Sequence, residues 1–380
     1  MKIRILLLIV AIFSFKASYS QNVDLDKFYF NVKFQKLPNV KTNLEERKYS
    51  FKVIAKEVIK PHVDEISLSS KLNVYGWQLV PDNATVKVTL TFEDFLQVGS
   101  DIRESRKETK DSQGKVVSSV VVGYYMQSNY AHRGFCVINA PKSAVELKAT
   151  VKQIEEKEKK IASNRFLANT QSAPKKETEN ENEYILRFNE TMIHNSSVRP
   201  TQKEVYDDVA MNKSNLFQEN LRKFTDNTIA SVMNHLNEKY GFQPTEEKDY
   251  LWILDNKNEE GKTQLEAIGA IKTIFNDAAA DKPTTQLEEE LKPLMDYFNS
   301  MKKRYTGTTK ADKKMRYAAC YNLSKIYYHL DKPEDAKKEG QLLIDNDYDT
   351  KDGKRLIERA QVLLDEFNTK QIYTRHNPKK

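Results

Sequence analysis

The residue types that most often perform catalysis or hold metals are present in this chain, but their spacing defines no site. No two of the six histidines stand at the spacing of metal ligands, and no His-Glu-x-x-His motif occurs. They are His62, His132, His194, His235, His329 and His376. Glycine occurs 11 times in 380 residues, and neither a Gly-x-Ser-x-Gly motif nor a glycine-rich phosphate loop is present. We therefore expect no metal site, no cofactor and no enzymatic activity.

Two short segments leave other chemistries open. Glu93 and Asp94 are adjacent carboxylates at the end of a predicted strand, where neighbouring side chains point to opposite faces and cannot readily flank one bond. Residues 124–132 (YYMQSNYAH) contain enough tyrosine for a ligand or sugar platform, although tyrosines also suit the core of a sheet. An enzyme with an unrecognised site would need a cleft that gathers Glu93, His132 or His194.

The elements that would position these residues are mainly β-strands in the first part of the chain. Residues 84–92 alternate apolar and polar side chains, which predicts a half-buried strand. Asp111-Ser-Gln-Gly114 has the composition of a tight turn and predicts an antiparallel hairpin. The predicted strands cover residues 27–35, 48–55, 84–92, 101–110, 115–126, 130–138, 184–188 and 249–254. An amphipathic helix is expected at 214–240, ended by Gly241 in a left-handed conformation.

One short pattern occurs twice in the chain. Residues 72–78 (LNVYGWQ) and 236–243 (LNEKYGFQ) both contain Tyr-Gly followed by an aromatic residue and Gln, and a predicted strand follows each. A duplicated or pseudo-symmetric αβ unit would explain this repetition, and chance is the alternative. We expect a structural role, in which glycine reverses the chain and the aromatic residues fix the turn to the sheet.

From residue 257 onward the chain is expected to be helical. The apolar stripe of 285–305 contains Pro293, and a proline inside a helix costs about 3 kcal/mol, which predicts a kink or a break. Further helices are predicted at 309–330, 333–346 and 353–367. The last residues, 369–380, show no periodicity and are expected to form a flexible tail.

Residues 315–348 have the pattern of two antiparallel helices joined at Asp331-Lys332-Pro333. Tyr321-Asn322-Leu323 followed by Tyr327-Tyr328, with the small Ala336 in the second helix, resembles a tetratricopeptide repeat. The departures from the family pattern are Cys320, Ser324, Gly340 and Tyr348. The resemblance implies a helical-repeat packing and a protein-binding face.

In such repeats the first helix presents the concave face. The resemblance therefore implies Tyr321, Lys325, Tyr328 and His329 as partner-binding residues. The alternative is that the two tyrosines simply pack against neighbouring helices. The whole chain also resembles secreted bacterial proteins of uncharacterised function, which pair a β-rich front with a similar tail. That resemblance supports the architecture and implies no activity.

The first residues of the chain predict export. Lys2 and Arg4 precede an apolar run at 5–15 that is too short to span a bilayer comfortably, and Ser18 and Ser20 suit a signal peptidase. We expect cleavage after Ser20, and a retained membrane anchor is the alternative. Cleavage would remove three basic residues and no acid, so the formal charge would fall from +7 to +4. This mild, mixed charge does not suggest nucleic-acid binding.

These observations predict an α+β protein with four parts. They are a signal peptide at 1–20, a β-rich, mainly antiparallel domain with αβ units at 21–256, a helical domain resembling tetratricopeptide repeats at 257–368, and a tail at 369–380. A polar loop or linker is expected near 155–183. Cys136 and Cys320 are expected to be free buried thiols, and one long-range disulfide is the alternative.

Three functions agree with the sequence. The first is a non-catalytic periplasmic or envelope protein, soluble after cleavage, that binds another envelope protein through its repeat-like helices. The second is a ligand- or glycan-binding β domain with the helices as a structural brace. The third is an enzyme with an unrecognised site.

Overall fold

The computed structural model describes residues 24–63, 68, 70–142, 183–254 and 259–379. Its contacts divide the chain into two compact units. We call Leu37–Gln243 the sheet–helix unit, and Met1–Lys36 with Pro244–Pro378 the helical unit. The α+β class predicted from the sequence is confirmed. The predicted signal peptide and most of the predicted polar loop lie outside the described residues.

The sheet–helix unit contains a five-stranded sheet. Its strands are β2 (Lys48–Ala55), β3 (Gln78–Leu79), β4 (Val86–Lys110), β5 (Val116–Asn139) and β6 (Glu183–Asn195), in the order β3-β2-β4-β5-β6. β4, β5 and β6 are antiparallel, as expected, but β2 runs parallel to both of its neighbours. Short 3₁₀ helices, η1 (Leu44–Glu46) and η2 (Lys60–His62), flank β2.

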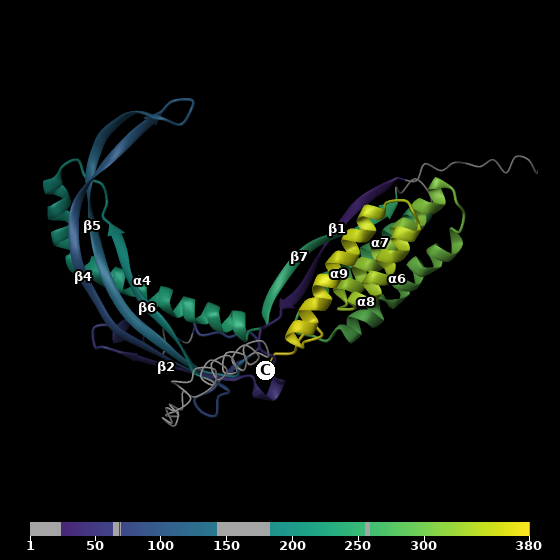
Figure 1. Ribbon diagram of the computed structural model, residues 1–380, viewed down its shortest axis with the longest axis horizontal. Helices are drawn as coiled ribbons and strands as arrows, with labels where there is room; N and C mark the ends of the chain where they lie inside the picture. The colour runs from purple at the N-terminus through teal and green to yellow at the C-terminus, as the bar shows by residue number, and fades with distance from the viewer. Residues whose placement is uncertain (1–23, 64–67, 69, 143–182, 255–258, 380) are drawn as a thin grey trace, which may run out of the picture. The chain divides into compact units, whose positions relative to one another are not determined.

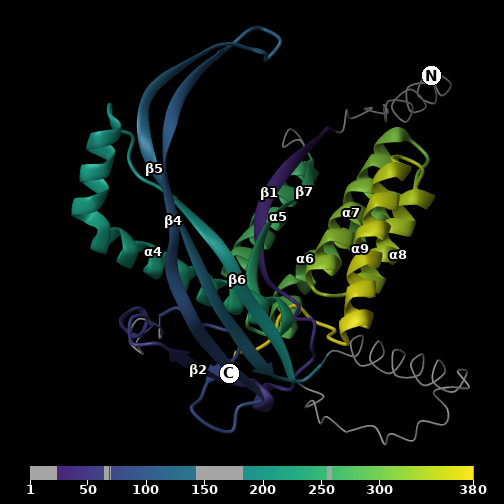
Figure 2. The ribbon, with the colours of Figure 1, turned by 60° about the vertical axis from the view of Figure 1, so that its left-hand side comes forward.

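The β4–β5 hairpin is the longest feature of this sheet. Segments predicted as separate strands are continuous, and β-bulges such as the one between Gln97 and Gly99 absorb the irregularities. β6 pairs with β5 only from Gln127 to Asn139. Beyond that point the hairpin extends past β6, as Figures 1 and 2 show. We call residues 101–122 the hairpin arm.

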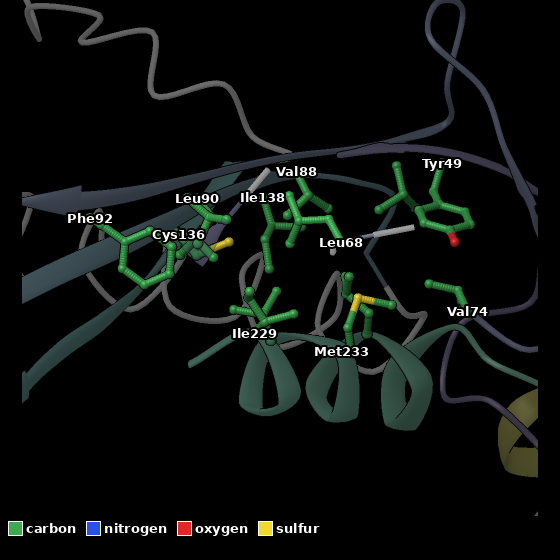
Figure 3. Close-up of a cluster of buried hydrophobic side chains, with 14 of the residues drawn as sticks. Tyr49, Leu68, Val74, Val88, Leu90, Phe92, Cys136, Ile138, Ile229 and Met233 are labelled. Carbon is green, nitrogen blue, oxygen red and sulfur yellow. The ribbon is translucent and has the colours of Figure 1, made fainter. Parts of the chain in front are cut away.

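A single long helix, α4 (Gln202–Lys239), packs on the sheet and forms the core of this unit. It begins at Thr201, whose hydroxyl accepts a hydrogen bond from the backbone N–H of Glu204 at 3.2 Å. Side chains of β4 and β5, among them Leu90 and Ile138, face Ile229 of α4 (Figure 3). All of these side chains are almost fully buried, so sheet and helix depend on one another for their hydrophobic stabilisation.

The two copies of the Tyr-Gly-aromatic-Gln pattern lie against each other in this unit. The amide oxygen of Asn237 accepts the backbone N–H of Tyr75 at 2.9 Å, and the Trp77 indole N–H donates to the carbonyl of Tyr240 at 2.8 Å. The backbone N–H of Phe242 donates to the Tyr75 carbonyl at 2.9 Å. The repeated pattern therefore joins the end of α4 to the segment that leads into β3.

The glycines of the two copies serve different purposes. Gly76 has a φ of +79°, a left-handed conformation that favours glycine. Gly241 was expected to be left-handed and is not. A Cβ atom there would lie 2.4 Å from the amide oxygen of Asn237, so this position requires glycine because of a close approach.

Within its described residues, the helical unit combines two strands with five helices. The strands β1 (Leu25–Lys36) and β7 (Gln243–Leu254) pair with each other. The helices are α5 (Glu259–Asp277), α6 (Thr284–Arg304), α7 (Lys310–His329), α8 (Pro333–Asp345) and α9 (Thr350–Lys370). Phe30 of β1 stacks on Phe275 of α5 with ring centroids 5.3 Å apart, in one core with α6 and α7. α6 continues through Pro293, so the predicted break is absent.

Small residues allow α8 and α9 to pack closely. A Cβ atom on Gly353 would lie 2.8 Å from the carbonyl oxygen of Gly340, and one on Gly340 would lie 2.8 Å from a side-chain carbon of Ile357. In α8 the buried Ala336 accepts a hydrogen bond at its carbonyl from the Ser324 hydroxyl of α7, at 2.9 Å. The hairpin of α7 and α8 is thus tightly packed, and its resemblance to a tetratricopeptide repeat stays a prediction.

Two features differ from the predicted organisation. β1 and β7 belong to the helical unit by their contacts, whereas the sequence grouped them with the β-rich domain. The predicted flexible tail is wrong for residues 372–377, because Arg375 and His376 are buried at 4% and 3% exposure. Among the described helices, none combines the length and apolar composition that a membrane span requires.

Candidate functional site

The structure buries most of the residues that the repeat resemblance implies for partner binding. All four lie on α7, where Tyr321 and His329 are fully buried, Lys325 is 6% exposed and Tyr328 is half-buried. β7 covers this part of α7, and Tyr250 stacks on Tyr321 with ring centroids 5.8 Å apart. These residues therefore present no open face to a partner.

A buried ionic cluster explains why two of these residues, Lys325 and His329, point inward. One carboxylate oxygen of Asp249 on β7 accepts a hydrogen bond from Lys325 Nζ at 2.5 Å. The other accepts from His329 Nε2 at 2.9 Å and from Arg359 Nη1 of α9 at 2.8 Å. Arg359 also donates to Glu247 at 2.7 Å. We call these five residues the Asp249 cluster, in which the carboxylates of Asp249 and Glu247 balance the cations Lys325 and Arg359.

The protonation states within this cluster follow from burial and charge. Burial disfavours the charge of Asp249, but the hydrogen bond from His329 and the charges of Lys325 and Arg359 hold the pKa of this carboxyl well below its usual range. Burial lowers the pKa of His329 to about 4, although its hydrogen bond to Asp249 acts in the opposite direction. His329 is therefore neutral at neutral pH and donates its Nε2 proton to Asp249.

An aspartate bonded to a histidine is also a common arrangement for general base catalysis. Here the side chains of His329 and Asp249 are 0% and 5% exposed; they bond to each other, and Asp249 also bonds to Lys325 and Arg359. A substrate cannot reach either group. The Asp249 cluster therefore acts as a structural connection between β7, α7 and α9.

The C-terminal tail closes the same side of the helical unit. Arg375 Nε donates to Asp331 at 2.6 Å, and the two side chains are 4% and 2% exposed. Two guanidinium groups lie over the Tyr328 ring, with the Arg359 carbon 4.0 Å and the Arg375 carbon 4.7 Å from its centroid. Asn377 donates its backbone N–H to Gln35 of β1 at 2.9 Å. The tail is thus fixed by charge and hydrogen bonding.

An open groove lies in the sheet–helix unit, between the start of α4 and the base of the hairpin arm. It encloses about 410 Å³, and its lining includes Val98, Ser128, Tyr130, Tyr206 and Lys213. Tyr206 and Val98 are 63% and 59% exposed, whereas Tyr130 is buried. We call it the α4 groove. It offers an aromatic rim with a few polar groups, as small-ligand sites commonly do.

The local structure explains why a groove forms at this place. The bulge at Gln97–Gly99 interrupts the regular pairing of β4 with β5. Gly99 lines the groove, and a Cβ atom there would meet no other atom within 4 Å. α4 is bent along its length, as Figures 1 and 2 show, and its first turns carry the exposed Tyr206 and Met211. Neither sheet nor helix fills this space.

The other residues singled out from the sequence do not form a catalytic cleft. His132 stacks on Phe224 at 4.2 Å between ring centroids and lines a shallow pocket with Glu190. Glu93 and His194 are not part of that lining. Within the described residues, no group of three or more metal-binding side chains is placed to hold an ion.

The two cysteines are free and buried, one in each unit. Burial raises the pKa of the Cys136 thiol and that of the Cys320 thiol to about 12. Both are therefore protonated at neutral pH and poor nucleophiles.

Sequence reasoning missed both the Asp249 cluster and the α4 groove. Asp249 and its partners lie 76 to 110 positions apart, so no local pattern reveals them. The start of α4 did have a signal, since Thr201 and Glu204 stand at the spacing of a capping box. Comparison with protein-family models, with curated proteins and with solved structures found no match for this chain.

Proposed function

We propose that this protein is an exported, non-catalytic binding protein of the cell envelope whose α4 groove takes a short glycan. The observation that carries this proposal is the exposure of Tyr206 at the rim of the groove, at 63%, above polar groups that include Ser128 and Lys213. A large tyrosine left this exposed beside a groove is suited to ligand contact.

The chemistry of the lining fits a sugar. The apolar face of a pyranose ring can stack on Tyr206, while its hydroxyl groups can bond with Ser128 and with Gln97. Lys213 adds a positive charge and so favours a sugar with a carboxylate. The volume of about 410 Å³ suits a unit of one or two sugars. A short peptide is the competing ligand, and the test below distinguishes the two.

In this proposal the helical unit is a structural brace. Two of its residues expected to bind a partner, Lys325 and His329, are occupied by Asp249, and the tail fixes the end of α7 through Asp331. Export is supported by the leader-like pattern of residues 1–20, which are outside the described part of the chain. Binding to another envelope protein through the helices is the less supported alternative.

The test is a binding panel with the purified protein. Acidic and neutral oligosaccharides, peptidoglycan fragments and short peptides are screened by thermal shift, and any hit is measured by calorimetry. Tyr206→Ala should weaken glycan binding about five- to ten-fold, which is the worth of one aromatic contact. Met211→Ala is the matched control, since Met211 is 79% exposed on the same helix and does not line the groove.

A second pair of variants tests the groove by filling it. Gly99→Phe should abolish binding because space is available there for the added side chain. Gly269→Phe makes the same change on α5, where a Cβ atom also meets nothing within 4 Å, and should leave binding unchanged. The proposal fails if no glycan stabilises the protein, if only peptides bind, or if Tyr206→Ala and Met211→Ala behave alike.

A further inference from the structure

The two edges of the hairpin arm differ sharply in charge. Seven of the ten residues 101–110 on β4 are charged, and Arg103 and Arg106 form ion pairs with Asp101 and Glu104. Residues 116–122 on β5 read VVSSVVV and contain no charge. Val116, Val117, Val120 and Val122 are 43–60% exposed.

The backbone of the β5 edge also lacks a neighbouring strand. Among the described residues, β6 pairs with β5 no further than Gln127, and an isolated bridge joins Tyr124 to Arg199. From 116 to 122 the one paired side of β5 faces β4. Charged residues on an edge strand prevent further pairing, whereas a neutral, β-branched edge promotes it. β4 is thus protected and β5 is open to pairing.

We propose that the β5 edge of the hairpin arm pairs antiparallel with the same edge of a second copy of this chain. The occupant follows from the sequence of the edge, because VVSSVVV reads almost the same in both directions. Antiparallel pairing about a two-fold axis at Ser119 places Ser119 opposite Ser119 of the second copy, with valine opposite valine at 117 and 121 and at 116 and 122. Such a contact is isologous, as a symmetric dimer requires.

The pairing changes the arm from two strands to four, in the order β4-β5-β5-β4. A two-stranded ribbon is only marginally stable in water, whereas a sheet of three or more strands is more stable. The charged β4 strands become the outer edges of the joined sheet. They oppose the addition of further strands, so the assembly closes at two copies and does not grow into a fibre. This inference is independent of the proposed glycan site.

Sedimentation velocity of the purified full chain over a range of concentrations tests the proposal. A reversible monomer–dimer equilibrium is expected. Val120→Glu should weaken the dimer about ten-fold or more, because each copy then places a charged side chain on the edge that must pair. Val120 pairs with Lys107 in its own hairpin, so the variant preserves the arm itself. Thr109→Glu adds the same charge to the β4 edge and should leave the equilibrium unchanged.

Cross-linking provides the second measurement. Ser119→Cys should form a disulfide-linked dimer under mild oxidation, and Thr109→Cys should not. The native cysteines, Cys136 and Cys320, are buried and give little background. A chain that is monomeric at all concentrations overturns the proposal. So does a dimer that Val120→Glu and Thr109→Glu affect equally, or a polymer in place of a dimer.

Discussion

The Asp249 cluster makes one strong prediction about stability. Asp249→Asn keeps the shape of the side chain but removes the negative charge that two buried or half-buried cations share. Lys325, whose side chain is 8% exposed, loses its carboxylate partner, and the new amide group faces the donors of His329 and Arg359. Removing one member of a buried ion pair costs about 3–5 kcal/mol. We expect a loss of about 3 kcal/mol, because Arg359 keeps Glu247.

The assay must report on the helical unit alone, because two units need not unfold together. The chain has two tryptophans, Trp77 in the sheet–helix unit and Trp252 on β7. In a Trp77→Phe background, the fluorescence of Trp252 during urea denaturation follows the helical unit. Asp296→Asn is the control, since its ion pair with Lys292 is exposed and screened by solvent and should change the stability little.

A double-mutant cycle separates the cluster from a general loss of packing. Lys325→Met alone should cost less than Asp249→Asn, because Asp249 keeps the hydrogen bonds from His329 and Arg359. Combined with Asp249→Asn, it should restore about 1–2 kcal/mol by removing the unpaired cation. The reasoning is refuted if Asp249→Asn costs less than about 1 kcal/mol, or if the two changes are additive.

Two further perturbations follow from the same unit. Burial lowers the pKa of His329 to about 4 in the folded protein, whereas it is about 6.5 in the unfolded chain. As the pH falls, the unfolded chain therefore binds a proton at a higher pH than the folded protein does. The free energy of unfolding should drop between pH 6.5 and 4 by up to about 3 kcal/mol. His329→Gln should flatten that slope, and equal slopes in urea titrations of both proteins would contradict the assignment. Arg375→Ala leaves the buried Asp331 without its guanidinium partner and should cost about 3 kcal/mol by the same Trp252 assay. Tyr373→Ala, at a residue 57% exposed, is its control, and similar losses for both variants would show that the tail contributes no specific ion pair.

Local patterns in the sequence predicted the elements well. The strand at 48–55 has the same bounds in the structure, and the turn at 111–114 joins β4 to β5 as expected. Alternation and turn composition are properties of a few neighbouring residues, so they can be recognised in the sequence without knowledge of the tertiary structure. The start of α4 was missed because its first turns, which include Tyr206 and Met211, are mainly polar and exposed.

Placement in space could not be predicted in the same way. Tyr321, Lys325 and His329 were expected on an open face because the repeat resemblance describes α7 by itself. In the structure β7 covers that face, and Asp249 supplies the partner for the buried cation. Nothing within the helical hairpin signals that a strand 76 positions earlier will lie against it. The same limit applies to the tail, whose Arg375 has its partner 44 positions away.

The two units differ in whether their charged, aromatic and backbone groups already have partners within the protein, and this difference indicates where a ligand would bind. In the helical unit, the buried cations Lys325 and Arg375 already have carboxylate partners and so do not attract a ligand. In the sheet–helix unit, the α4 groove exposes Tyr206, and residues 116–122 present strand backbone without a neighbouring strand among the described residues. Free strand edges and exposed aromatic side chains gain most from a partner, because binding pairs the open backbone groups and removes apolar surface from water. If one surface binds ligand and the other binds a second copy, Tyr206→Ala should weaken glycan binding alone and Val120→Glu should weaken dimer formation alone.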